Sequence, residues 1–266
     1  MNDLSQNDLE RKMITVASGK GGVGKTWIST TLAHTLSRMG RKVLLFDGDI
    51  GLANIDIQLG LMPARDLGGV ISGHYDLSSA ITPYDDPMNS TGKLDVLAGK
   101  SGSGSLGTLG REKLGSIRAG LTALAANYDH VILDLAAGVD ASVNTLSAHK
   151  GTTVVVLTPD PTSLTDAYAF IKLSLMRDRN ADIKVLVNMA SSKREAEKTY
   201  QALNKATEGF LKFTVPYLGM IKRDKFVQES IRHQKSILVR YPQSEAASEM
   251  MDIARQFPSR RKAMAG

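Results

Sequence analysis

The stretch Ser18-Gly19-Lys20-Gly21-Gly22-Val23-Gly24-Lys25-Thr26 follows an apolar segment, Met13 to Ala17, and precedes an amphipathic one, Trp27 to Met39. It fits the frame G-x-x-x-x-G-K-[ST], in which glycines let backbone N–H groups close around a β-phosphate. Lys25 then neutralises phosphate charge, and the Thr26 hydroxyl can bind Mg²⁺. The first free N–H groups of the following helix add to the same anion site. The predicted nucleotide-binding residues here are Gly21, Gly22, Val23, Gly24, Lys25, Thr26 and Trp27.

Apolar runs of strand length alternate with amphipathic stretches of helix length along the rest of the chain. This pattern predicts an α/β fold with a doubly wound, mostly parallel sheet, helices on both faces, and ligands at the carboxyl ends of the strands. We expect one P-loop domain over residues 13–257, a polar extension at 1–12 and a basic tail at 258–266. The expected strands are Ile14–Ala17, Lys42–Asp47, Leu94–Ala98, His130–Leu135, Thr153–Thr158, Ile183–Asn188 and Tyr217–Met220. The expected helices are Trp27–Met39, Arg111–Ala126, Ser163–Met176, Lys193–Thr207, Lys225–Arg232 and Gln243–Gln256.

Composition narrows the function classes. The 266 residues contain no cysteine, which excludes disulfides and thiolate chemistry, and the five histidines show no H-x-x-x-H spacing typical of a metal site. The polar first dozen residues lack the core of a signal peptide, and no apolar run approaches the ~20 residues that span a bilayer. We expect a cytoplasmic protein. Residues 99–107 are rich in Gly and Ser but lack the Gly-Lys-Thr ending, so we expect a mobile surface loop there.

The formal net charge of +6 permits contact with nucleic acid or anionic lipid without requiring it, because a basic cluster is often only a solvated face. The tail after Pro258 is too short and too polar to anchor the chain in a membrane alone, so any peripheral membrane contact should be weak or need two tails in a dimer. The basic cluster consists of Lys222, Arg223, Lys225, Arg232, Lys235 and Arg240.

Three acidic residues stand at predicted strand ends. Asp47 and Asp49 close the run Lys42–Asp49, and Asp134 closes the run Val131–Asp134. Phosphoryl transfer needs a magnesium shell and a group that orients water, so we predict Asp134 and Asp47 at the metal and Asp49 at the attacking water. Any one of these acids alone could simply cap a strand or helix. Their combination with the loop favours the catalytic interpretation.

The loop Lys20–Thr26 resembles the deviant Walker A motif of the MinD/ParA class of ATPases. Asp47–Asp56 resembles the switch I of MinD-like members, and Asp134–Gly138 resembles switch II. Within the class, three softer motifs are most similar to the FlhG (FleN/YlxH) family of flagellar-number ATPases. The resemblance covers about residues 13 to 256. The softer motifs are Thr158–Tyr168, Leu186–Ala190 and Val215–Gly219 with Tyr241-Pro242.

This resemblance implies ATP and Mg²⁺ as ligands and a homodimer in the ATP state. It implies that Lys20 reaches the partner's ATP and that Asn54 helps to hold the γ-phosphate side. It places Asn188 at the adenine edge, where a strand-end cap is the alternative, and Asp224 in a loop that closes over the base. Trp27 and Lys222 depart from the family, which has a small polar residue and a proline at these places.

The leading hypothesis is therefore an ATP-dependent dimerising switch that hydrolyses ATP slowly and regulates flagellar number or placement. Its partner would be a flagellar protein, such as an FlhF-like GTPase or a transcription factor, although residues 1–12 show no match to the family's glutamine-bearing activator motif. One alternative is a ParA-like or MinD-like positioning ATPase for DNA, cargo or the division site. Another is a regulatory protein that senses ATP and holds a transcription factor without needing hydrolysis.

Overall fold

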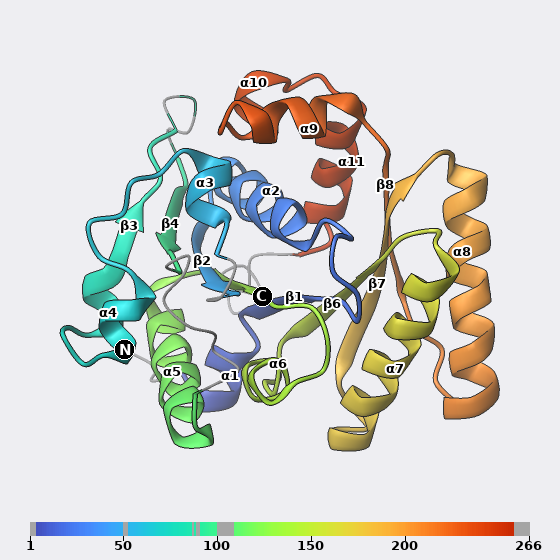
Figure 1. Ribbon diagram of the computed structural model, residues 1–266, viewed down its shortest axis with the longest axis horizontal. Coiled ribbons are helices and arrows are strands. Elements are labelled where there is room, and N and C mark those ends of the chain that lie inside the picture. The colour runs from blue at the N-terminus through green and yellow to red at the C-terminus, as the bar shows by residue number, and fades with distance from the viewer. Residues whose placement is uncertain (1–3, 50–52, 87, 89–90, 100–108, 258–266) are drawn as a thin grey trace, which may run out of the picture.

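The computed structural model describes residues 4–49, 53–86, 88, 91–99 and 109–257. In this part of the chain, eight strands form one sheet in the order β3-β4-β2-β5-β1-β6-β7-β8, and every neighbouring pair is parallel except β3 with β4. The predicted doubly wound architecture is confirmed (Figure 1). The strands are β1 Met13–Ala17, β2 Lys42–Gly48, β3 Ile81–Pro83, β4 Lys93–Leu97, β5 His130–Leu135, β6 Thr152–Leu157, β7 Asp182–Ala190 and β8 Tyr217–Lys222.

Helices cover both faces of the sheet, and Figure 1 shows α2, α9, α10 and α11 on one side with α5, α6 and α7 on the other. The α-helices are α1 Gln6–Glu10, α2 Lys25–Arg38, α3 Ile55–Leu59, α4 Leu67–Ile71, α5 Arg111–Leu124, α6 Ala141–Leu146, α7 Pro161–Arg177, α8 Lys193–Ala206, α9 Lys225–Arg232, α10 Ile237–Arg240 and α11 Glu245–Ala254. Single turns of other helix types are η1 Leu77–Ala80, η3 Ala125–Asn127 and the π-helical η4 Thr207–Leu211. No helix in the described ranges is both long and apolar enough to cross a membrane.

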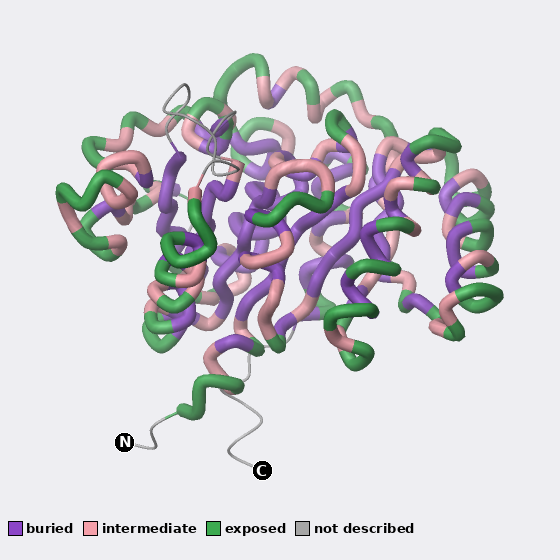
Figure 2. Tube along the Cα trace, turned by 60° about the horizontal axis from the view of Figure 1, so that its bottom comes forward, coloured by how far each residue is buried: buried purple, intermediate pink, exposed green. Residues whose placement is uncertain are grey.

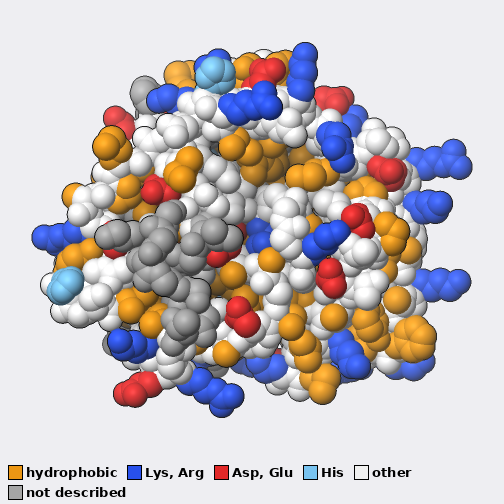
Figure 3. All heavy atoms as spheres, viewed as in Figure 1, with side chains coloured by type: hydrophobic (Ala, Val, Ile, Leu, Met, Phe, Trp, Pro, Cys, Tyr) orange, Lys and Arg blue, Asp and Glu red, His pale blue; other side chains and the backbone are white. Residues whose placement is uncertain are grey.

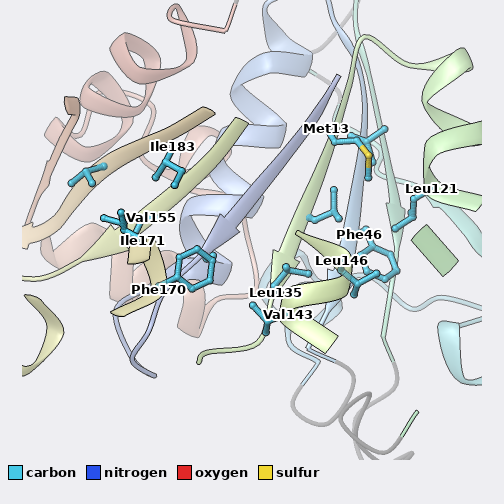
Figure 4. Close-up of a cluster of buried hydrophobic side chains, with 14 of the residues drawn as sticks. Met13, Phe46, Leu121, Leu135, Val143, Leu146, Val155, Phe170, Ile171 and Ile183 are labelled. Atoms are coloured by element: carbon cyan, nitrogen blue, oxygen red, sulfur yellow. The ribbon is translucent and has the colours of Figure 1, made fainter. Parts of the chain in front are cut away.

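Two apolar cores lie on opposite faces of the sheet because successive strand residues point to opposite sides. In β2, Leu44 and Phe46 join the core beneath α5 to α8, while Val43 and Leu45 join the core beneath α2 and α11. Figure 4 shows the Phe46 ring next to Leu146, with Leu121 nearby. Figure 2 shows that residues along the central strands are mostly buried. The sheet therefore carries apolar residues on both faces, as the continuous apolar runs predict.

The predicted strands and helices are all present, with ends that differ by a few residues. The elements missing from the prediction are short: α1 lies within the predicted polar extension, and β3, α3, α4, α6 and α10 each span three to six residues. Most of the predicted Gly-rich loop, the middle of the switch I motif (residues 50–52) and the basic tail lie outside the described residues. The carboxyl ends of β1, β2, β5, β6 and β7 meet at one edge of the sheet, where the predicted site residues gather.

Candidate nucleotide-binding site

The phosphate loop joins β1 to α2 and its backbone needs glycine at defined positions. Gly22 and Gly24 have φ values of 76° and 89°, in the left-handed region that side chains disfavour. A Cβ on Gly24 would lie 2.5 Å from Nδ2 of Asn188, whereas Gly21 and Gly22 have no heavy atom within 4 Å of that position. The loop is thus packed on its inner side and open on its outer side. An open cradle of backbone N–H groups is what a phosphate requires.

Lys25 and Asp134 form the buried charged centre of the site. Asp134 is 1% exposed, and the Ser29 hydroxyl, one turn beyond Lys25 in α2, donates to its Oδ1 at 2.9 Å. Burial raises the pKa of Asp134 to about 6, although hydrogen bonds from Thr26 and Ser29 and the Lys25 charge oppose the rise. Burial likewise lowers the pKa of Lys25, against the charges of Asp134 and Asp49. Burial therefore disfavours the ionised forms of both side chains. A bound phosphate and metal ion would offset this cost by placing opposite charges beside them.

The Thr26 hydroxyl and the Asp134 carboxylate fit Mg²⁺ in chemistry, because this ion prefers oxygen donors and keeps several waters or phosphate oxygens. The described residues contain no cluster of three or more acidic, His or Cys side chains that would form an all-protein metal cage. The arrangement therefore suits a metal ion that arrives with a nucleotide. Direct binding by Asp47, the third predicted metal residue, stays a prediction.

Asp47 holds the backbone of the switch I segment. Its Oδ1 accepts from the N–H of Asp49 at 3.2 Å, and its Oδ2 accepts from the N–H groups of Asn54 and Ile55 at 3.1 and 3.2 Å. Burial, followed by the charge of Asp134, raises the pKa of Asp47 to about 8. The Asp47 carboxyl group thus accepts hydrogen bonds from residues that precede and residues that follow 50–52 in the chain. Asp47 thereby fixes where Asp49 and Asn54, two predicted catalytic residues, enter the site.

Asp49 and Asn54 stand at the two ends of this segment. Asp49 is partly buried and its charge acts on Lys25, which places it on the phosphate side of the site. Asn54 occupies the N-cap position of α3 and its side chain makes no capping hydrogen bond there. Their predicted roles at the attacking water and the γ-phosphate remain predictions that this placement suits.

The predicted base-binding residues are engaged with the protein itself. The Nδ2 of Asn188 donates to the carbonyl of Val23 at 2.7 Å, which ties the end of β7 to the phosphate loop. Asp224 caps α9: its Oδ1 accepts from the N–H of Phe226, and its Oδ2 accepts from the N–H of Ala246. Both residues have clear local structural roles. Adenine recognition by either one stays a prediction.

Trp27 lies one residue beyond Thr26 and is 5% exposed. It belongs to the apolar core that also contains Val23 of the loop and Leu59 of α3. Its indole N–H is buried and has no hydrogen-bond partner among the described residues. The bulky residue is accommodated as core, beside the loop.

Lys20 stands in a different environment from Lys25. Its side chain is 38% exposed, and its ammonium donates to Oδ2 of Asp160 at 3.0 Å and to the hydroxyl of Thr162. Asp160 is the N-cap residue of α7 and Thr162 lies in its first turn, shortly after β6 ends at Leu157. Lys20 and Asp160 also line a surface cavity of about 340 Å³ with Glu195 and Arg223. One lysine of the loop thus points inward and the other lies at the outer rim.

Three residues of the site were not predicted from the sequence: Ser29, Asp160 and Thr162. Ser29 could have been found, because it lies one helical turn after Lys25 and faces the same way. Asp160 precedes Pro161 at a helix start, which predicts a cap but not a lysine partner. Its contact with Lys20 joins residues 140 positions apart.

The comparisons with known proteins agree with this geometry. Residues 14–237 match the family described as the CobQ/CobB/MinD/ParA nucleotide binding domain. The chain therefore belongs to that family, a class of P-loop nucleotide-binding proteins with the MinD/ParA fold.

Two curated relatives match most of the chain, and one of them is named for the flagellum. The chain is 34% identical over 249 residues to the antiactivator FleN of Pseudomonas aeruginosa, covering 93% of this chain and 86% of the relative. It is 32% identical over 244 residues to the flagellum site-determining protein YlxH of Helicobacter pylori, covering 91% and 79%. The predicted resemblance to the FlhG (FleN/YlxH) group is confirmed.

Solved structures show the same fold. The cell division ATPase MinD of Pyrococcus furiosus superposes with a TM-score of 0.76 at 24% identity, covering 92% of this chain and 98% of that one. MinD of Pyrococcus horikoshii in complex with Mg-ADP superposes with a TM-score of 0.75 at 23% identity, covering 96% and 97%.

Proposed function

We propose that this protein is a slow ATPase that dimerises in its ATP state and regulates the number or placement of flagella. The observation that carries the proposal is the contrast between the two lysines of one phosphate loop. Lys25 is buried beside Asp134, where it can neutralise phosphate in its own subunit. Lys20 is at the rim, where a second subunit could meet it. The similarity to FleN and to the flagellum site-determining protein YlxH supports the biological role.

In this mechanism the residues position groups and compensate charge. Lys25 and the loop N–H groups bind the phosphates, and Asp134 with Thr26 holds Mg²⁺, which when bound supplies charge compensation at the phosphate oxygens. Asp49 orients the attacking water, and Asp47 keeps Asp49 in place through its backbone. Lys20 from the partner stabilises negative charge that develops in the transition state. Hydrolysis then returns the protein to the monomer.

The biochemical test makes two measurements on the full chain: the molar mass by light scattering, and the rate of phosphate release. Each is made without nucleotide, with ADP and with ATP. We expect Lys25→Ala to lose nucleotide binding, Lys20→Ala to bind ATP without dimerising, and Asp49→Ala to accumulate the ATP dimer with hydrolysis reduced at least about tenfold. Lys193→Ala is the matched control, because that lysine is 81% exposed on α8. Wild-type hydrolysis by Asp49→Ala would contradict the proposal.

The cellular test places Lys25→Ala at the native locus and counts flagella per cell. A changed number or position supports the flagellar role. Normal flagella in cells that make the variant at the wild-type level would move the role to DNA, cargo or division-site positioning.

A second candidate function, ATP-dependent attachment to DNA, is favoured by one surface. Lys225, Arg232, Lys235 and Arg240 are exposed on α9, α10 and the link between them, and Figure 3 shows basic side chains over this part of the molecule. Binding to non-specific duplex DNA that needs ATP and falls steeply with salt would support it. No binding at low salt would exclude it.

A further inference from the structure

Lys20 is held within its own subunit by two side chains that are hydrogen-bonded to each other. Its ammonium donates to Asp160 and Thr162, and the Thr162 hydroxyl donates in turn to the second carboxylate oxygen of Asp160 at 2.8 Å. The lysine also leads the causes that lower the pKa of Asp160 to about 2, so this carboxylate is ionised at any working pH. An ammonium in these contacts is turned toward α7 and engaged with it.

The loop and α7 are also packed together through their backbones. A Cβ on Gly19 would lie 2.3 Å from the carbonyl oxygen of Asp166, so the residue before Lys20 rests directly on the second turn of α7. The position of Lys20 is therefore tied to the start of this helix by packing as well as by charge. A displacement of α7 would change both contacts together.

From these contacts we infer that Asp160 and Thr162 are positioning residues that hold Lys20 in a resting conformation and so compete with its use by a second copy of the chain. The inference rests on the proposed function, because it assumes that Lys20 acts across a dimer. Each subunit must give up its own Lys20–Asp160 contact before its lysine can reach the partner's nucleotide. Asp160 and Thr162 thereby raise the protein and ATP concentrations that dimerisation needs.

The strength of the contact suits a reversible restraint. Lys20 and Asp160 are 38% and 46% exposed, and pairs of this kind contribute little because water and salt screen them. We expect release of Lys20 to change dimer affinity about two- to fivefold per subunit. A dimer releases two such lysines, so the combined effect is about four- to twenty-fivefold.

Asp160→Asn is the discriminating variant, because asparagine caps a helix as well as aspartate does while it removes the charge. Thr162→Val removes one acceptor and leaves the charge. Asp178→Asn is the matched control: Asp178 follows the other end of α7 and pairs with Lys150 at 2.8 Å, far from the loop. Urea unfolding of each variant checks that the fold is kept.

The first measurement uses nucleotide-free monomer and does not depend on dimerisation. Amines are acylated briefly with dilute acetic anhydride, and labelling at Lys20 is compared with Lys193 by mass spectrometry. We expect Asp160→Asn to raise relative labelling of Lys20 at least about twofold, since an unpaired amine reacts faster, and Asp178→Asn to leave Lys20 unchanged. Equal labelling of Lys20 in wild type and Asp160→Asn would overturn the inference.

The second measurement is the dimer dissociation constant with a non-hydrolysable ATP analogue. We expect Asp160→Asn to tighten the dimer about four- to twenty-fivefold, Thr162→Val to act in the same direction by less, and Asp178→Asn to match wild type. A wild-type protein that stays monomeric contradicts the proposed function itself. A wild type that dimerises while Asp160→Asn dimerises equally or more weakly overturns only the resting-state role of Asp160.

Discussion

Asp47 of β2 and Asp134 of β5 are register partners in adjacent parallel strands, and each is 1% exposed. Two carboxyl groups so close to each other do not both ionise readily in a buried site. Burial and this proximity raise their pKa values to about 8 and about 6. We therefore expect the pair to keep one proton near neutral pH in the absence of nucleotide, and a bound metal ion would favour ionisation of both carboxyl groups.

This pair predicts a stability that falls as pH rises. The pKa of Asp47 is higher in the folded protein than in the unfolded chain, so the folded state binds the extra proton, and the stabilisation is lost as pH rises toward 8. Between pH 6.5 and 8 we expect the free energy of unfolding to fall by up to about 1.4 kcal/mol per pH unit. Urea denaturation in EDTA without nucleotide measures it.

Asp47→Asn is the control for this pH dependence, because it keeps a neutral side chain of the same shape. The variant should have a flatter profile over the same range. Burial lowers the pKa of His149 to about 3 and also lowers the pKa of His34, so both add some stability as pH rises through about 6.5 and partly oppose the Asp47 slope. This contribution is the same in wild type and Asp47→Asn, so the difference between the two profiles reports Asp47. An unchanged slope in Asp47→Asn would show that another group titrates.

A second prediction concerns the buried network between α2 and the segment after β3. The ring Nε2 of His34 is 2.7 Å from Oδ2 of Asp86, and the Arg38 guanidinium donates to both oxygens of that carboxylate. Burial opposes ionisation, but the hydrogen bonds from Arg38 and His34 hold the pKa of Asp86 below its usual value. Asp86→Ala should cost about 3–5 kcal/mol, because it leaves a cation without its partner.

The double variant Arg38→Leu with Asp86→Ala separates pairing from packing. Since it leaves no unpaired charge, it should be less destabilised than the sum of the single changes. Asp178→Asn, which breaks a surface pair, should cost no more than about 1 kcal/mol. Additive single changes at Arg38 and Asp86 would contradict the coupling.

Two glycines allow a matched prediction. Gly24→Ala should abolish nucleotide binding, because φ is 89° and the added carbon would lie 2.5 Å from the Asn188 amide. Gly115→Ala, within α5, meets nothing within 4 Å and should stabilise the protein by about 0.5–1 kcal/mol. Titration with ATP and thermal unfolding measure the two outcomes. ATP binding at wild-type affinity by Gly24→Ala would exclude the proposed loop geometry.

The sequence predicted the parts of the fold and site that depend on local pattern. Long apolar runs placed β1, β2 and β5, and their ends placed Lys25, Asp47 and Asp134 at one edge of the sheet. The three-residue β3 has too few residues to show a period, so it was missed.

The contacts that the site side chains make could not be predicted from local pattern. Asp47 was predicted at a metal ion, and that role stays a prediction. Its acceptance of hydrogen bonds from the N–H groups of residues 49, 54 and 55 could not be predicted, because it depends on where these three groups lie in the folded chain. The Lys20–Asp160 contact depends on the packing of α7 against the loop. Neither relation has a local sequence signal.

Trp27 is the single tryptophan of the chain and lies in the apolar core. Trp27→Ala should cost about 3–5 kcal/mol, because it opens a cavity in the core beneath α3 and α9. Trp27→Phe keeps an aromatic ring and removes a buried N–H that has no partner within the described residues, a group that costs about 1–3 kcal/mol when unsatisfied. The smaller ring and the lost N–H act in opposite directions, so Trp27→Phe should stay within about 1 kcal/mol of wild type. Urea denaturation followed by circular dichroism compares the three proteins. If Trp27→Phe were as destabilised as Trp27→Ala, the indole N–H would have to be hydrogen-bonded in solution, and the interpretation of Trp27 as plain core beside the loop would be wrong.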